Sequence, residues 1–209
     1  MPTLPPLTVF DVETTGLDPR KGHRIVEIAA VRIEGGRMLE SETFHSLVNP
    51  ERDIPWEVKQ IHHLSEQDLA HAPTIMNVLP QFLSFAQGSL LVAHNAAFDK
   101  GFLEAEKEFC WGYIELPEIL CTMRLSQNLY PTAFRHNLDI LCERFKISMP
   151  ADRHRALPDV LLTAQIFLKM LESARIQSME ELRRKASLSG PAMPAVKSVL
   201  APTRSTWKA

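Results

Sequence analysis

The chain has 209 residues, of which 45% are hydrophobic and 23% are charged, and its formal net charge is −2. This composition excludes a mainly disordered chain, a collagen and a coiled coil, and the length is enough for one sizeable domain. Because the charge is balanced, any role in nucleic-acid binding must depend on local basic residues or on cations that the protein recruits.

No apolar run reaches the roughly 20 residues that are needed to cross a bilayer. The first residues, Met-Pro-Thr-Leu-Pro-Pro, show neither a basic start nor an apolar signal core. We therefore expect a cytoplasmic protein. Its three cysteines, Cys110, Cys121 and Cys142, are too few and too scattered for a disulfide framework or a Cys-x-x-Cys zinc site, so we expect them to be reduced.

The pattern of apolar residues predicts an α/β domain with a mixed sheet. Strands are expected over 7–12, 25–33 and 39–48, and Gly35-Gly36 between the last two is typical of a tight hairpin turn, which makes that pair antiparallel. After Pro50 helices and short strands alternate. They are expected over 74–86 (helix), 89–93 (strand), 97–109 (helix), 118–121 (strand), 122–129, 137–145, 158–173 and 178–186 (helices).

The sequence changes character from Ala186 onward, where Ser and Pro are frequent and Asp and Glu are absent. This composition predicts a flexible tail over 186–209 after a folded domain over 1–185. The tail carries apolar and basic residues together, so docking to a partner protein and extra contact with nucleic acid are both compatible with it. A solvated tail without a role is equally compatible.

Two carboxylates, Asp11 and Glu13, lie at the end of the first expected strand. Because side chains alternate along a strand, both project to the face that carries Leu7 and Val9. Two charges at the end of an apolar face are costly unless a cation neutralises them. This segment alone is also compatible with a solvated strand end.

Two further acids begin helices. Asp99 lies in the first turn after the strand 89–93, and Asp159 lies in the first turn of a long helix that starts close to Pro158. His154 precedes that helix in a loop, from which its side chain could reach the same cleft as Asp159. Each acid alone is common without a function, but four of them in three segments predict a site for Mg²⁺ or Mn²⁺, which prefer oxygen ligands.

Three motifs in this order resemble the DEDD superfamily of 3′–5′ exonucleases, in the subclass with a catalytic histidine that includes the proofreading epsilon subunits of bacterial DNA polymerase III. The resemblance covers roughly residues 7–175. The motifs are Phe10-Asp11-Val12-Glu13-Thr14-Thr15-Gly16-Leu17, His94-Asn95-Ala96-Ala97-Phe98-Asp99 and His154-Arg155-Ala156-Leu157-Pro158-Asp159, and residues 136–144 resemble the segment before the third motif.

The resemblance implies a ribonuclease H-like fold with a central mixed sheet. It implies that Asp11, Glu13, Asp99 and Asp159 bind two Mg²⁺ or Mn²⁺ ions and that His154 is the general base. In such a two-metal reaction the cations activate water and stabilise the leaving 3′ oxygen, and the product is a nucleoside 5′-monophosphate.

The resemblance also implies contacts with the terminal nucleotide. They are expected from Thr14, Thr15, Gly16, Leu17, His62, Asn95 and Phe98. Leu17 is expected to wedge beside the last base and Gly16 to permit a sharp turn. For Phe98, packing in the core is the stronger expectation, and Asn95 could equally cap the helix. The segment around His62 departs from the family, because His63 stands where a glycine is usual, and His63 is expected on the surface.

The leading hypothesis is an exonuclease that removes nucleotides from the 3′ end of DNA, in proofreading or repair, with single-stranded or frayed ends as substrate. A 3′–5′ exoribonuclease is the second hypothesis, because relatives with similar motifs trim RNA. The third is a non-catalytic nucleic-acid-binding or polymerase-accessory module. Loss of a carboxylate or of the histidine would favour that third hypothesis, and all five residues are present. A DNA polymerase or another replication protein is a candidate partner of the tail.

Overall fold

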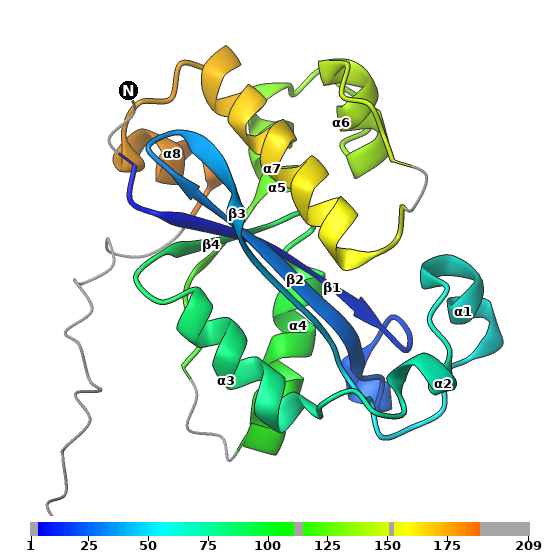
Figure 1. Ribbon diagram of the computed structural model, residues 1–209. Coiled ribbons are helices and arrows are strands. Elements are labelled where there is room, and N and C mark those ends of the chain that lie inside the picture. Colours follow the sequence, from blue (N-terminus) through cyan, green and yellow to red (C-terminus); the bar gives the residue numbers. More distant parts are fainter. Residues whose placement is uncertain (1–3, 111–114, 151–152, 189–209) are drawn as a thin grey trace, which may run out of the picture.

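The computed structural model describes residues 4–110, 115–150 and 153–188. Its centre is a five-stranded sheet with the order β3-β2-β1-β4-β5 (Figure 1). The strands are β1 (Leu7–Thr14), β2 (Ile25–Glu34), β3 (Arg37–Leu47), β4 (Leu90–Ala93) and β5 (Ile119–Cys121). β1, β2 and β3 pair antiparallel, whereas β4 is parallel to both β1 and β5, so the predicted mixed sheet is confirmed.

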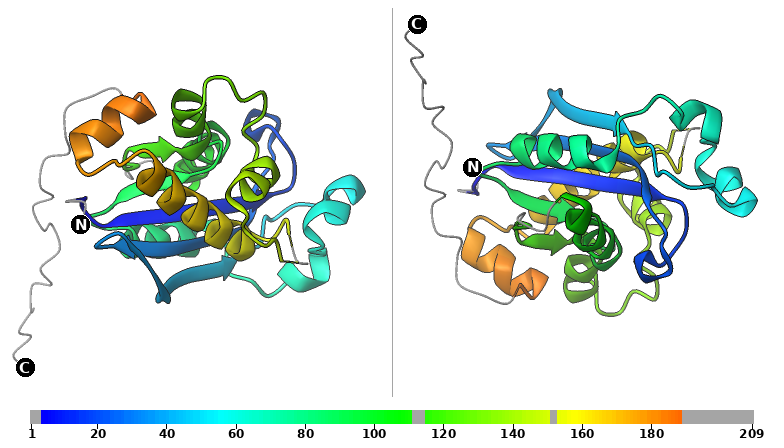
Figure 2. Two further views of the ribbon diagram at one scale, coloured as in Figure 1. Left: turned by 90° about the horizontal axis from the view of Figure 1, so that it is seen from above. Right: turned by 90° about the horizontal axis from the view of Figure 1, so that it is seen from below.

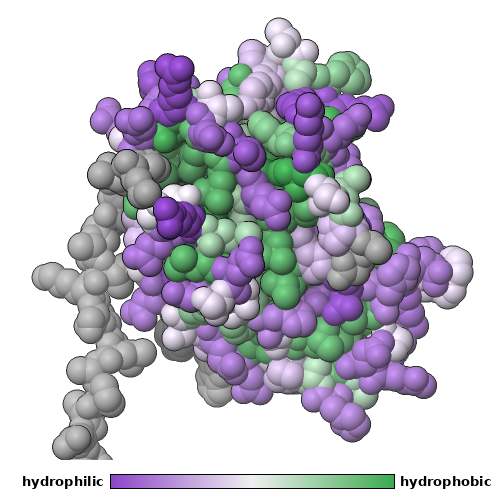
Figure 3. Space-filling model, turned by 45° about the horizontal axis from the view of Figure 1, so that its top comes forward, coloured by the Kyte–Doolittle hydropathy of each residue, from purple (hydrophilic) through white to green (hydrophobic). Residues whose placement is uncertain are grey.

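Helices cover both faces of this sheet, with α7 across one face and α3 and α4 on the other (Figures 1 and 2). The helices are η1 (Pro19–Lys21), α1 (Trp56–His62), α2 (Glu66–Leu69), α3 (Ile75–Phe85), α4 (Ala97–Glu106), η2 (Lys107–Cys110), α5 (Thr122–Leu129), α6 (Leu138–Phe145), α7 (Ala156–Ser173) and α8 (Met179–Ala186). The face of the molecule in Figure 3 is mostly hydrophilic, with hydrophobic patches between the polar side chains.

Side chains alternate along β1, and this alternation determines which of them are buried on each face of the sheet. Leu7 and Val9 belong to the apolar cluster beneath α7, while Phe10 and Val12 belong to the cluster beneath α3 and α4. Asp11 and Glu13 continue the register of Leu7 and Val9 and therefore face the α7 side. The sheet thus directs both acids toward the helix that carries Asp159.

Several boundaries differ from the sequence-based expectation. β1 continues to Thr14 instead of ending at Val12, because Glu13 and Thr14 still pair with β2 across an irregular register. The helix expected over 97–109 changes to a tighter 3₁₀ turn after Glu106. α7 begins at Ala156 rather than near Pro158, which fits its first turn because the N–H that proline lacks would have no partner there.

The helices α1 and α2 were not expected from the sequence. α2 has a readable signal, because Ser65 and Asp68 form a reciprocal capping box in which each side chain accepts a hydrogen bond from the other residue's backbone N–H. α1 follows Pro55, which has no capping side chain, so its start carries no comparable sequence signal.

The predicted tail begins inside a helix. Ala186 is the last residue of α8 and is buried, and the backbone N–H of Leu188 donates to Arg183. The rest of the predicted tail, 189–209, lies outside the described residues. The three cysteines are unpaired thiols. In the part of the chain that the structure describes, no helix is long and apolar enough to span a membrane.

Candidate active site

Three carboxylates meet where α7 crosses the carboxyl end of β1. Asp11 and Glu13 extend from the strand, and Asp159 extends from the first turn of the helix. One ligand oxygen from each lies within 4.8 Å of the other two. This spacing suits a shared hard cation, because several carboxylates at one point provide the oxygen ligands that Mg²⁺ and Mn²⁺ prefer.

The fourth acid, Asp99, approaches from the α4 side. It lies in the first turn of α4, as predicted, and only 1% of its surface is exposed. Its Oδ1 has no hydrogen-bond partner among the residues that the structure describes. A buried carboxylate oxygen without a donor is costly, so Asp99 is a further group that a bound cation would satisfy.

The electrostatics of the cluster point to the same requirement. Burial and repulsion from neighbouring acids raise the pKa of Glu13 to about 8, and burial raises the pKa of Asp99 to about 7. The pKa of Asp11 is also well above its ordinary value, because the half-buried carboxyl group is desolvated and faces Asp99, Glu13 and Asp159. These carboxyl groups cannot all ionise near neutral pH unless positive charge enters the site, so the donor set fits divalent cations.

One positive charge already lies in the cluster, and sequence reasoning missed it. The guanidinium of Arg153 donates to Asp159 Oδ1 and, at 2.6 Å, to Asp139 Oδ1 in the first turn of α6. The signal that could have found it is a basic residue directly before the loop histidine of the third motif.

His154 lies in the loop before α7, as predicted. Its side chain is exposed, and its backbone has a φ of 65°, which is the left-handed region. Such a conformation is uncommon for a residue with a β-carbon and requires support from the surrounding structure. The histidine is therefore open to solvent and directly follows Arg153, which binds Asp159 of the acidic cluster.

The loop that follows β1 is tied to the strand that returns from it. The backbone N–H of Thr15 donates to Arg24 O at 2.8 Å, and Thr15 Oγ1 accepts from the N–H of Arg24 at 3.0 Å. Thr14 Oγ1 donates to the carbonyl of Gly16 at 2.6 Å. Leu17 follows with 86% of its surface exposed, which leaves this apolar side chain free to contact a ligand.

The chain bends at residues 15–17, where a sharp turn was expected, but Gly16 is not among the glycines with positive φ. A β-carbon at this position would lie 2.4 Å from two atoms of the His23 ring. A β-carbon at Gly16 would therefore force the imidazole or the loop to shift, because the ring packs directly against the backbone. His23 Nδ1 also lies 3.3 Å from Thr15 Oγ1, so the same ring contacts a second residue of the loop.

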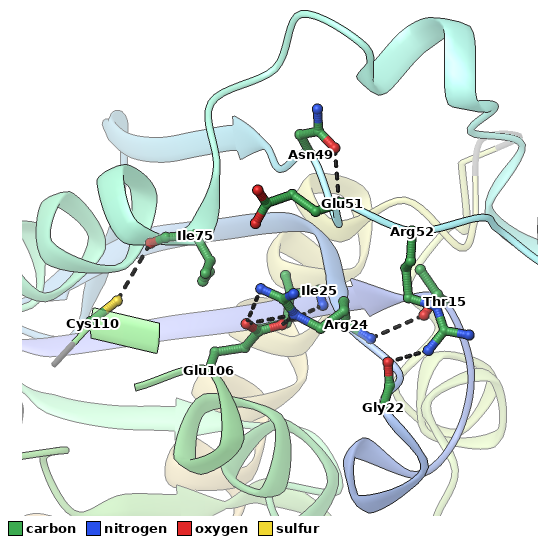
Figure 4. Close-up of polar contacts among 10 residues, drawn as sticks. All are labelled: Thr15, Gly22, Arg24, Ile25, Asn49, Glu51, Arg52, Ile75, Glu106 and Cys110. Atoms are coloured by element: carbon green, nitrogen blue, oxygen red, sulfur yellow. Dashed lines mark hydrogen bonds and ion pairs between the residues drawn. The ribbon is translucent and has the colours of Figure 1, made fainter. Parts of the chain in front are cut away.

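Arg24 braces the base of the same loop (Figure 4). Its Nε donates to Glu106 on α4 at 3.0 Å, and Glu106 also accepts from the backbone N–H of Ile25 at 2.9 Å. The guanidinium carbon lies 3.9 Å from the ring centroid of Phe109, and Arg52 donates to the carbonyl of Gly22. The sequence carries one signal for this contact, which is Glu106 itself. It is a charged residue four positions after Phe102 on the apolar face of the helix, where a buried charge needs a partner.

His62 is fully buried at the end of α1. Its Nδ1 accepts from the N–H of Leu64 at 3.0 Å, while its Nε2 has no partner within the described residues. His63 is exposed and adopts a left-handed φ of 59°. His63 therefore adopts the left-handed backbone conformation that suits glycine, the residue that is usual at this position.

The two remaining predicted contacts differ in their surroundings. Asn95 is exposed with a φ of 59° and does not cap α4, because Ala96 is the N-cap residue and provides no side-chain bond. Phe98 is half-buried with its ring centroid 5.0 Å from that of Phe102, so the expectation of core packing is confirmed.

Comparisons with known proteins agree with this geometry. The family described as Exonuclease (RNase_T) matches residues 8–167. A DNA polymerase III subunit epsilon from Rickettsia prowazekii (strain Madrid E) is 39% identical over 167 residues, which cover 78% of this chain and 72% of that protein. A DNA polymerase III subunit epsilon-like protein from Rhodobacter capsulatus is 42% identical over 172 residues, and the match covers 82% of this chain but only 24% of that relative.

Solved structures show the same likeness. Exonuclease X in complex with 5′ overhanging duplex DNA superimposes with a TM-score of 0.69 at 30% identity, covering 86% of this chain and 99% of that one. The nuclease domain of 3′hExo, a DEDDh family member bound to rAMP, has a TM-score of 0.73 at 18% identity, covering 84% and 96%, and it shares the fold.

The chain therefore belongs to the exonuclease family, with the ribonuclease H-like fold that its motifs predicted. Within that family it is a 3′–5′ exonuclease of the DEDD superfamily, similar to the epsilon subunit of DNA polymerase III.

Proposed function

We propose that this protein removes nucleotides one at a time from the 3′ end of DNA, and that His154 is the general base. The observation that carries the proposal is that Asp11, Glu13 and Asp159 each place a ligand oxygen within 4.8 Å of the other two, with raised pKa values at Glu13 and Asp99, while the loop before the helix of Asp159 exposes His154. Asp11, Glu13, Asp99 and Asp159 would hold two divalent cations, Mg²⁺ or Mn²⁺. When bound, the cations supply the charge that activates water and stabilises the leaving oxygen.

The histidine and the β1 loop have separate tasks in this proposal. A neutral imidazole can accept a proton from water as a general base, and its exposure lets His154 reach the substrate end. The braced loop from Thr14 to Leu17 contacts the terminal nucleotide, and the exposed Leu17 packs beside its base. Because His62 Nδ1 accepts from the N–H of Leu64, its Nε2 is an N–H donor; it is buried without a partner among the described residues, and a nucleotide could satisfy it.

DNA is the substrate that the relatives favour. The Rickettsia relative is named as a subunit of a DNA polymerase, and the solved Exonuclease X structure contains DNA. By the same reasoning we propose that the protein works in the cytoplasm and that a DNA polymerase is its partner. The segment after Leu188 is the proposed contact with that partner, and the catalytic domain would end at Leu188, because α8 and its cap belong to the fold.

A matched pair of oligonucleotides tests this function. DNA and RNA of one sequence, labelled at the 5′ end, are digested with Mg²⁺ and with Mn²⁺, and the products are resolved at single-nucleotide resolution. We expect the labelled DNA to shorten stepwise and to release nucleoside 5′-monophosphates. Faster stepwise shortening of RNA would establish the exoribonuclease instead, and cleavage within covalently closed circular DNA would contradict an exonuclease.

A further inference from the structure

His154 is flanked by two arginines, and each arginine is held by carboxylates of other elements. Arg153 binds Asp139 of α6 and Asp159 of α7, and Arg155 binds Glu27 of β2. The loop between α6 and α7 is thereby attached on both sides of the histidine. None of these attachments involves the imidazole, which stays exposed.

The attachment through Arg155 has the geometry of a bidentate ion pair. Arg155 Nε lies 3.0 Å from Glu27 Oε2, and Nη2 lies 2.8 Å from Oε1. Only 1% of Glu27 is exposed. The fork of a guanidinium matches a carboxylate at two points, which fixes orientation as well as distance, and lysine cannot reproduce this match.

Two more donors complete the environment of Glu27. The backbone N–H of Ala156, the first residue of α7, donates to Glu27 Oε2 at 3.1 Å, and His45 Nε2 lies 2.6 Å from Oε1. The carboxylate therefore caps α7 from the neighbouring strand, since Arg155 itself provides no capping bond. Glu27 also lies opposite Glu13 in the β1–β2 register, so its ion pair with Arg155 begins next to β1, the strand that carries Asp11 and Glu13.

The strained backbone lies between these two attachments. His154 has a φ of 65°, whereas Arg155 is extended with φ −122° and ψ 142°. A left-handed residue with a β-carbon persists only where its neighbours are fixed. With Arg153 and Arg155 fixed to different elements, the backbone sets the direction of the Cα–Cβ bond of His154, from which the exposed imidazole extends.

We propose that Arg155, together with Glu27, is a positioning residue that sets the place of His154 through the backbone. The proposal rests on the proposed role of His154 as the general base. It requires no contact between Arg155 and the substrate, because the guanidinium is occupied by Glu27. Arg155 should therefore influence turnover and leave substrate binding nearly unchanged.

A double-mutant cycle separates this positioning role from a general structural one. Arg155→Gln is made in the wild-type background and in a His154→Gln background, and single-turnover rates and KM are measured on a labelled DNA oligonucleotide. Arg155→Gln is expected to lower the rate about 10–100-fold in the first background, since small misplacements of a catalytic group have effects of this size. In the second background the loss should be under about 3-fold, because the group being positioned is gone. KM should stay within about 3-fold, and Arg155→Lys should recover only part of the rate.

Arg183→Gln is the matched control. Arg183 also binds a carboxylate at two points, Glu118, with Nη2 2.9 Å from Oε1, but it lies on α8 at the other end of the fold (Figure 1). The control variant should lose stability in thermal unfolding and keep the wild-type rate. If Arg155→Gln does not fold, the same cycle is run with Arg155→Lys.

The outcomes distinguish the two proposals. An equal loss of rate in both backgrounds, with an active wild type, would refute positioning by Arg155 and leave the exonuclease function intact. A wild-type rate for His154→Gln itself would contradict the assigned general base, and the positioning role with it.

Discussion

Gly16→Ala is the substitution whose outcome the structure specifies most closely. A β-carbon at Gly16 would lie 2.4 Å from atoms of the His23 ring, a distance that real contacts do not reach. Either the ring or the loop must move, and the contact between His23 and Thr15 is lost in both cases. Overpacking of this kind typically costs about 1–3 kcal/mol. Because the same loop is proposed to hold the terminal nucleotide, kcat/KM should fall about 10-fold.

The assay combines urea unfolding with initial rates on a short single-stranded DNA. His23→Ala removes the ring and serves as the matched partner. The double variant Gly16→Ala, His23→Ala should recover most of the stability that Gly16→Ala alone loses, since the clash is then absent. A Gly16→Ala variant within about 0.5 kcal/mol of the wild type, the range of an ordinary surface substitution, would show that the His23 ring does not constrain this position.

Three further outcomes follow from the carboxylate cluster and the tail. Without divalent cations the stability should decrease as pH rises from about 6.5 toward 8, because the folded-state pKa values of Asp99 (about 7) and Glu13 (about 8) lie above their ordinary values and the folded protein binds the extra protons. Below about pH 6.5 the lowered pKa of the half-buried His94, about 4, contributes with the opposite sign, so the test uses the upper window. Unfolding curves across this range should show the decrease, Mg²⁺ should offset it, and a stability that rises with pH would contradict the shifts. Asp99→Asn should unfold at a higher temperature than the wild type at pH 8 without metal, yet digest DNA slower by orders of magnitude, and comparable digestion rates would remove Asp99 from the catalytic set. Truncation after Leu188 should leave the rate on a short oligonucleotide within a few-fold of wild type, and an inactive but folded Leu188 truncation would place the tail in the active site. Truncation after Lys185 should destabilise the fold, because it removes the buried Ala186, the Ser187 Oγ that lies 2.9 Å from Asn128 and the Leu188 N–H that donates to Arg183 O.

The sequence predicted the core of the fold because its elements have strong periodic signals. The hairpin at Gly35-Gly36 is present with positive φ at both glycines, and the first-turn positions of Asp99 and Asp159 are as expected. These features depend on local rules, such as alternation along a strand and the tolerance of proline in a helix's first turn. The assignment to a 3′–5′ exonuclease similar to the epsilon subunit is confirmed by the family and its relatives.

The parts that could not be predicted depend on contacts between distant segments. Glu27 and Arg155 are 128 positions apart, and Arg24 and Glu106 are 82 apart. No local sequence pattern predicts such pairs. The ion pairs that hold the His154 loop and the β1 loop are therefore found only in the three-dimensional structure. The proximity of the His23 ring to Gly16 is a further contact between separate positions of the chain that no local pattern predicts.

The central claim is that the four clustered carboxylates hold the cations with which this protein hydrolyses DNA from its 3′ end. The most direct measurement counts Mn²⁺ ions bound by the wild type and by Asp11→Asn, and follows digestion of 5′-labelled single-stranded DNA by the same samples. The wild type should bind two ions and shorten the DNA stepwise, while Asp11→Asn should bind fewer ions and slow the reaction by orders of magnitude. Stepwise digestion by the wild type in the presence of excess chelator, or an unimpaired Asp11→Asn, would contradict the account.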